Sequence, residues 1–409
     1  MSDVLATTVR EEWGRLTALL LARYRRLDLV EDALGDAVEA AARTWPVDGV
    51  PDKPAAWLHT AASRRVIDRL RTEATAQRVQ PLLVMEATRV GGGQVMADPG
   101  ALVEDDLLRL VLMCAHPSLA TDSASALSLR LVLGVPTPDI ARLFLVPEAT
   151  MAARLTRAKK KIVGAGVPFG VPDASVLPDR LDSVARVAYL AFTAGYSPGT
   201  GADLLRAPLS GEAIRLARSV LAMRPDEPVL VALLALMLFQ HSRRDARVRD
   251  GRLVLLPDQD RERWHHHEIA EAQALLGSAA LRGPITVQTA AYTIQARIAA
   301  EHALPTSTAT TRWEHVVGLH DLLLTVAPTP SSRLARAVAV AEAQGPAAGL
   351  AALEGVEIPT THRVAAVRAE LLARSGDVDA ARAACDQAIA GCRNDVEIAH
   401  LRERRQSLG

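Results

Sequence analysis

The stretch TPDIARLFLVPEATMAARLTRAKKKI, residues 137–162, carries the clearest structural pattern in the chain. The Thr-Pro pair at its start supplies a good N-cap and a favourable first helical residue, which predicts a short helix over Asp139–Phe144. A tight turn follows at Leu145-Val146, and Pro147 then opens a second helix. Two short helices joined by such a turn are typical of a helix-turn-helix.

The second helix of this stretch has two faces of opposite character. Its apolar stripe consists of Met151, Leu155, Ala158 and Ile162. Its polar stripe consists of Thr150, Arg154, Arg157 and Lys161. The apolar stripe can pack on the first helix while the polar stripe reaches base edges and phosphates, with Arg154 able to bind guanine through two hydrogen bonds. The alternative is an ordinary amphipathic helix with a solvated basic face.

The composition outside this stretch predicts an all-α protein. The chain has 409 residues, of which 49% are apolar but only 3% aromatic, and it lacks long Val/Ile/Thr runs of period two. Its length allows two or three domains. The three cysteines form no CxxC pair and fit a reducing cytoplasm. The longest apolar run, Val229–Phe239, is too short to cross a bilayer, which takes roughly 20 residues.

The charges are segregated although the formal net charge is zero. Residues 27–52 contain seven acids and only one basic residue, Arg43, whereas residues 149–162 contain five basic residues and no acid. Residues 63–80 hold five arginines against two acids. Local charge sets the field that a partner meets, so the zero total does not exclude nucleic acid.

Breakers and helical repeats divide the rest of the chain. Periodic apolar residues predict helices before and after the loop PVDGVPDKP at residues 46–54. Glycines and prolines mark flexible connectors in residues 78–103 and 164–177. Beyond them, EAIRLARSVLAMRPDEP and GDVDAARAACDQAIAGC have the register of tetratricopeptide-like helices.

The N-terminal half resembles the extracytoplasmic-function (ECF) sigma factors of bacterial RNA polymerase. VEDALGDAVEAAARTW and VPDKPAAWLHTAASRRVIDRLR are similar to their region 2, and residues 123–162 are similar to their region 4. DDLLRLVLMCAHPSLA, YLAFTAGY, RPDEPVLVALLALML and LVLLPDQDRERW resemble the subgroup with a C-terminal tetratricopeptide-like extension. The resemblance covers nearly the whole chain.

The resemblance implies five segments. They are region 2 over residues 4–77, a flexible linker over 78–103, region 4 over 104–163, a second linker over 164–177, and a helical regulatory domain over 178–409. The implied partners are promoter DNA, core RNA polymerase (its β′ clamp and β flap) and a regulatory protein bound by the C-terminal domain. No membrane, cofactor or metal is implied.

The resemblance also implies roles for individual residues. Those expected to read the −35 element are Glu148, Thr150, Arg154, Arg157, Lys160 and Lys161. Those expected to engage the −10 element are Asp48, Lys53, Arg64, Arg65, Asp68, Arg69 and Arg71. Those expected to bind polymerase are Glu31, Asp32, Asp36 and Glu39. Many relatives carry a basic residue where this chain has Ala152, which leaves more of the −35 readout to Glu148, Thr150 and Arg154.

Alternatives remain for several of these residues. The acidic helix can be a merely solvated face, and Asp68 can be an intrahelical partner of Arg64 or Arg71. WHHHE at residues 264–268 invites a metal assignment, but adjacent histidines on a helix diverge, so a polar helix start beside a core Trp264 is expected. Cys114 and His116 resemble a ligand pair but are expected at a structural helix end. RVGGGQ lacks the GK[ST] ending of a phosphate loop.

No catalytic constellation stands out, so an enzyme is not expected. The sequence favours a promoter-specificity subunit located in the cytoplasm. Two other functions stay open: a helix-turn-helix regulator that binds an operator without polymerase, and a helical-repeat adaptor that does not bind DNA.

Overall fold

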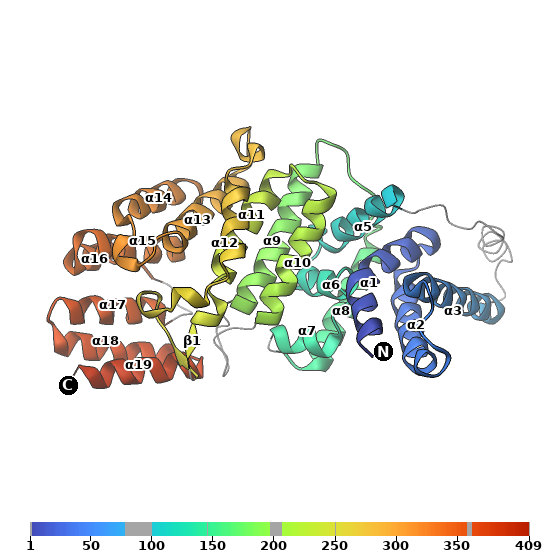
Figure 1. Cartoon of the computed structure of the whole chain (residues 1–409), viewed down its shortest axis with the longest axis horizontal. Coiled ribbons are helices and arrows are strands. Elements are labelled where there is room, and N and C mark those ends of the chain that lie inside the picture. The colour runs from blue at the N-terminus through green and yellow to red at the C-terminus, as the bar shows by residue number, and fades with distance from the viewer. Residues whose placement is uncertain are drawn as a thin grey trace. The chain divides into compact units, whose positions relative to one another are not determined.

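The computed structural model describes residues 2–77, 100–144, 146–196, 207–249, 251–357 and 362–408. Helices account for nearly all regular structure in these residues, which confirms the all-α prediction (Figure 1). The predicted connector up to residue 99, with its RVGGGQ segment, and Leu145 of the predicted turn lie outside the described residues. Two compact units make up the chain, Met1–Leu190 and Ala191–Gly409.

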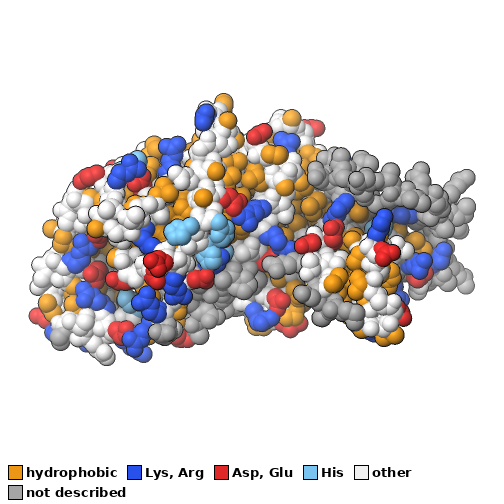
Figure 2. All heavy atoms as spheres, viewed as in Figure 1, with side chains coloured by type: hydrophobic (Ala, Val, Ile, Leu, Met, Phe, Trp, Pro, Cys, Tyr) orange, Lys and Arg blue, Asp and Glu red, His pale blue; other side chains and the backbone are white. Residues whose placement is uncertain are grey.

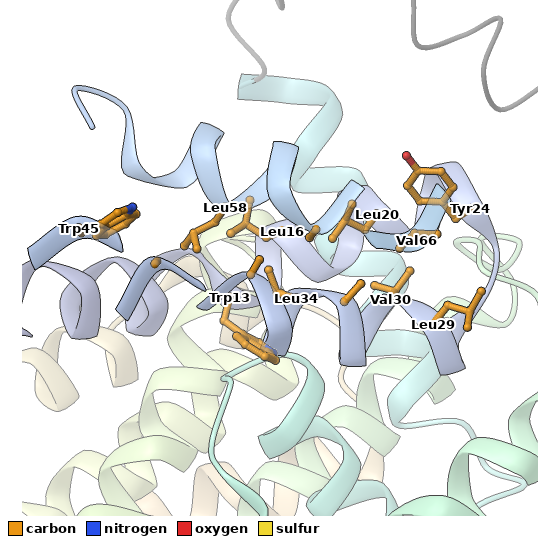
Figure 3. Close-up of a cluster of buried hydrophobic side chains, with 14 residues drawn as sticks. Trp13, Leu16, Leu20, Tyr24, Leu29, Val30, Leu34, Trp45, Leu58 and Val66 are labelled. Atoms are coloured by element: carbon orange, nitrogen blue, oxygen red, sulfur yellow. The ribbon is translucent and has the colours of Figure 1, made fainter. Parts of the chain in front are cut away.

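Three helices open the N-terminal unit: α1 (Ser2–Tyr24), α2 (Leu27–Asp48) and α3 (Pro54–Gln77). They share one core, whose buried members include Trp13, Leu20, Leu34 and Leu58 (Figure 3). The i, i+4 spacing of Leu58, Ala62, Val66 and Leu70 predicts one apolar face for this helix, and that face packs on the core, with the first three residues buried and Leu70 half-buried. The arginines of α3 therefore lie on its other faces.

The predicted loop at residues 46–54 is shorter in the structure, because α2 continues through Pro46 to Asp48. Proline lacks an N–H, but near the end of a helix this removes only one hydrogen bond of the ladder. The backbone N–H of Gly49 still donates to the carbonyl of Trp45 at 3.1 Å. Gly49 then adopts a φ of 89°, a left-handed value that favours glycine and ends the helix.

Four further helices follow in this unit, and the last two form the predicted helix-turn-helix. They are α5 (Gly100–Cys114), α6 (Thr121–Leu131), α7 (Thr137–Phe144) and α8 (Glu148–Gly164). Helix α1 packs on α5 and contacts α6. The turn after α6 contains Gly134, with φ +69°, where an added Cβ would lie 2.6 Å from Cγ of Trp13. Only a glycine permits this close approach.

Helix α9 (Leu177–Tyr196) contains the boundary between the two units. Within the N-terminal unit, the Ser125 hydroxyl of α6 donates to the carbonyl of Val187 at 3.0 Å. The Arg180 guanidinium donates to the carbonyl of Leu112 at 2.9 Å. The first part of α9 is thus attached to α5 and α6. The domain boundaries given from the sequence stay a prediction.

Successive helices pack on each other in the C-terminal unit. The α-helices are α10 (Ala207–Met223), α11 (Pro228–His241), α12 (His266–Leu276), α13 (Val287–Ala303), α14 (Trp313–Val326), α15 (Pro330–Gln344), α16 (Pro346–Ala352), α17 (Arg363–Arg374), α18 (Val378–Gly391) and α19 (Asp395–Ser407). Short 3-10 helices are η1 (Arg244–Ala246), η2 (Leu256–Asp258), η3 (Arg261–Arg263), η4 (Ala279–Arg282) and η5 (Thr308–Thr310). A small antiparallel hairpin joins β1 (Val248–Arg249) to β2 (Arg252–Leu253), with Val248 opposite Leu253.

The apolar run of the C-terminal unit is a core helix. Every residue of α11 from Val229 to Phe239 is buried, which explains why it is apolar on all sides. Among the described residues, no helix combines the length and apolar character needed to span a bilayer. Figure 2 shows acidic and basic side chains interspersed over the visible surface, in keeping with the zero net charge.

Candidate nucleic-acid interface

Helix α8 has the two faces predicted from its sequence. Its first turn starts after Pro147 and contains Glu148. The predicted apolar stripe is fully buried, since Met151, Leu155, Ala158 and Ile162 are each at most 4% exposed. Contacts of α8 with α6 and α7 supply this burial. The stripe therefore fixes which side of α8 faces outward.

The outward side of α8 carries the residues predicted to read the −35 element. Thr150, Arg157, Lys160 and Lys161 are exposed, and Arg154 is half-buried among them. Within the described part of the chain, no ion pair is found for these four basic residues. Their charges are thus available to phosphates, and the helix presents a continuous basic surface. We call Arg154, Arg157, Lys160 and Lys161 the basic face of α8.

Lys159 of the same helix points elsewhere and meets an acid of α2. Its Nζ lies 2.7 Å from Oε2 of Glu31, and Nε of Arg130 on α6 lies 2.7 Å from Oε1 of Glu31. Glu31 is 7% exposed. Burial alone would raise the pKa of Glu31, but the hydrogen bonds and charges of Lys159 and Arg130 outweigh it and lower that pKa.

This arrangement separates Glu31 from the other three residues predicted to bind polymerase. Its carboxylate is enclosed by two cations, whereas Asp32 and Glu39 are exposed and Asp36 is half-buried. The burial could not be read from the local sequence, because Arg130 and Lys159 are 99 and 128 residues away. Asp32, Asp36 and Glu39 form an acidic surface on α2, where each also pairs with an arginine of the chain, Arg69 or Arg43.

The residues predicted for the −10 element gather on α3 and the loop before it. Arg64, Arg65 and Asp68 are exposed, and Asp68 pairs with Arg71 at 3.9 Å in an (i, i+3) contact. Arg69 instead reaches α2, where it contacts Asp32 at 3.3 Å and Asp36 at 2.8 Å. Asp32 and Asp36, which were predicted to bind polymerase, are thus paired with Arg69, which was predicted to bind DNA.

A cavity of about 560 Å³ lies where the loop joins α3. Its lining includes Lys53, Trp57, Thr60 and Arg64, so basic groups flank an aromatic ring. Edge-to-face contact with Trp45, with ring centroids 5.6 Å apart, holds the Trp57 ring in place. Trp57 and Thr60 were not among the predicted site residues. The signal available in the sequence was the helical spacing of residues 53, 57, 60 and 64.

Of the two −10 residues predicted outside α3, Lys53 lines this cavity and Asp48 does not appear in its lining. Asp48 is exposed at the end of α2, and Lys53 is exposed directly before α3 and lines the cavity. A second hollow of about 400 Å³ is lined by Asp36, Arg65, Asp68 and Arg69 among others. The structure therefore divides the predicted −10 residues between two adjoining surfaces of the α2–α3 pair.

The histidine-rich segment has structural partners. Trp264 is buried, and α12 starts two residues later at His266, so the predicted polar helix start beside a core Trp264 is confirmed. Nε2 of His265 lies 2.7 Å from Asp245, and Glu268 contacts both His241 and Arg244. The Glu268 carboxylate is thus paired with side chains of the protein itself.

Cys114 and His116 also have structural surroundings. Cys114 is fully buried at the end of α5, where burial raises its thiol pKa. Nδ1 of His116 lies 2.8 Å from the Ser118 hydroxyl.

Two family models match parts of the chain. The model described as "Sigma-70, region 4" matches residues 109–162, which contain α6, α7 and nearly all of α8. The model described as "Family of unknown function (DUF6596)" matches residues 180–280. No solved structure matches the chain.

A curated relative covers almost the full length. It is an uncharacterized protein of Rhizobium meliloti (strain 1021), 39% identical over 397 residues, and the match covers 95% of this chain and 92% of the relative. The chain therefore belongs to the family of this Rhizobium protein, and its region 4 domain supports a place among the sigma-70 factors.

Proposed function

We propose that the chain is an ECF-type sigma factor, a dissociable subunit that gives RNA polymerase its promoter specificity. The observation that carries this proposal is the basic face of α8, which has no acid partner within the described residues and lies in the region 4 match. Initiation chemistry would belong to the polymerase.

The −35 element would be read by α8 in the major groove. Arg154 sits midway along the exposed side, where a guanidinium can bind the O6 and N7 atoms of guanine. Arg157, Lys160 and Lys161 follow toward the C-terminal end of the helix and would hold phosphates. Glu148 and Thr150 lie in the first turns, where recognition helices contact bases.

The −10 element would be opened at the cavity beside Trp57. Extruding a base costs a few kcal/mol of stacking, and stacking on an aromatic side chain returns about 1–3 kcal/mol. Lys53 and Arg64 on the cavity wall would hold the backbone of the extruded nucleotide. Arg65 and Arg71, both exposed on α3, would follow the displaced strand.

Polymerase would be bound by the acidic surface of α2, formed by Asp32, Asp36 and Glu39, against the β′ clamp. The region 4 module would meet the β flap. The C-terminal helical unit would act as a tetratricopeptide-like regulatory domain, because stacked helix pairs offer concave surfaces for peptides. It would stand in for a separate anti-sigma protein in the bacterial cytoplasm.

Run-off transcription tests the proposal. Sheared genomic DNA from the source organism is transcribed by its core polymerase with and without the chain. We expect new, chain-dependent 5′ ends that Arg154→Ala reduces and that Arg224→Ala, an exposed arginine of the C-terminal unit, leaves unchanged. DNA binding without initiation would favour an operator-binding regulator. If the chain binds neither DNA nor polymerase, the result would favour a helical-repeat adaptor.

A further inference from the structure

Three potential metal ligands converge where the last helices of the chain meet. His362 directly precedes α17, Cys392 directly follows α18, and Glu397 lies in the first turn of α19. Nε2 of His362 is 3.1 Å from Oε2 of Glu397, and Sγ of Cys392 is 3.8 Å from the same oxygen. All three ligand atoms lie within 4.8 Å of one another.

These separations suit a tetrahedral ion. Bonds of about 2.0–2.3 Å in a tetrahedral zinc site place neighbouring ligand atoms about 3.2–3.8 Å apart. Imidazole nitrogen, thiolate sulfur and carboxylate oxygen are the ligands that zinc takes in proteins. A thiolate and a carboxylate together also balance the charge of a divalent ion. We propose that His362, Cys392 and Glu397 bind one Zn²⁺ ion, with water in the fourth position.

The surroundings hold the three ligands in place. Cys392 is buried in an apolar cluster with Ala388 and Leu401. The Asn394 side chain caps α19 by accepting hydrogen bonds from the backbone N–H groups of Val396 and Glu397, at 3.2 and 3.1 Å. This cap orients the turn that carries the carboxylate. A bound ion would therefore clamp the ends of three helices and stabilise the folded C-terminal helices over the unfolded chain.

Cobalt titration of the reduced, metal-stripped full-length protein tests this site. We expect 1:1 Co²⁺ binding with a thiolate charge-transfer band, displaced by Zn²⁺, and a higher Tm with Zn²⁺. The other two cysteines provide matched controls, because both are buried and free: Cys385→Ser and Cys114→Ser keep the band, whereas Cys392→Ser loses it.

Absence of stoichiometric binding, or a band that survives Cys392→Ser, would overturn the zinc site and leave an ordinary His–Glu pair beside a thiol. If Cys392→Ser does not fold by circular dichroism, Glu397→Gln decides. Its Co²⁺ affinity should fall by roughly 10-fold or more, as expected when a metal site loses a ligand or its support. Unchanged affinity in that variant would reject the proposal.

Discussion

Two ion-pair clusters of the N-terminal unit use neighbouring acids of α2 but differ in burial. Glu31 is enclosed by Arg130 and Lys159, and its side chain is 9% exposed. Asp32 and Asp36 pair with Arg69, and their side chains are 63% and 42% exposed. Water screens the second cluster, so its pairs contribute little to stability, whereas breaking the first leaves cations with few other partners.

The largest effect is expected from Glu31→Ala. It removes the common partner of Arg130 and Lys159, which should lower the free energy of unfolding by about 3 kcal/mol. Denaturant unfolding measures the change, with Glu39→Ala as the matched control because Glu39 is exposed and, among the described residues, pairs only with Arg43 on its own helix. Equal stability losses in both variants would show that burial does not distinguish the two clusters.

The pH dependence should sharpen the same comparison. The pKa of Glu31 is lowered from 4.5 in the folded protein, so the pair stabilises the fold above about pH 4.5 and loses that contribution as the pH falls through the folded value. Glu31→Gln lacks this titration. The stability difference between wild type and Glu31→Gln should therefore shrink below pH 4.5. A difference that stays constant down to pH 3 would contradict the pairing.

Arg154 and Lys161 belong to one helix and should respond differently. Arg154→Ala should weaken binding to the cognate −35 duplex by about 1–3 kcal/mol, with specificity relaxed at one position. Fluorescence anisotropy at fixed salt measures it. Lys161→Ala is the control, since loss of a phosphate contact should weaken all sequences alike and lower the salt slope by about 1. If both variants show the same dependence of binding on DNA sequence and on salt, base reading by Arg154 is rejected.

The smallest effect is expected from Asp36→Ala. Arg69 keeps Asp32 as a partner in this variant, so the unfolding free energy should fall by less than about 1 kcal/mol. Its effect on polymerase binding should be larger than its effect on stability if the acidic surface of α2 contacts the clamp. Co-elution with core polymerase measures the binding. Normal co-elution together with a large loss of unfolding free energy would contradict the assignment of Asp36 to the polymerase-binding surface.

Local periodicity predicted the helix-turn-helix to within a few residues. The stripe Met151, Leu155, Ala158 and Ile162 is buried because a helix of 3.6 residues per turn aligns these positions, and no distant information is needed to see it. The same spacing places Leu58, Ala62 and Val66 on the buried side of α3. These features depend on residues close together in the sequence.

Features that depend on distant residues were not predicted. Glu31 looks like the other acids of α2 until Arg130 and Lys159 are brought against it by tertiary packing. The cluster of His362, Cys392 and Glu397 likewise needs the ends of three helices. The extension of α2 through Pro46 was missed for another reason, because proline is a strong breaker signal but is tolerated in a last turn.

Association with core RNA polymerase tests the central claim most directly. The purified chain and core enzyme are mixed at low salt and separated by size-exclusion chromatography. We expect a 1:1 complex that is weakened when Asp32, Asp36 and Glu39 are changed together to Asn, Asn and Gln. If the chain elutes apart from the polymerase at every salt concentration, its role as a promoter-specificity subunit is contradicted.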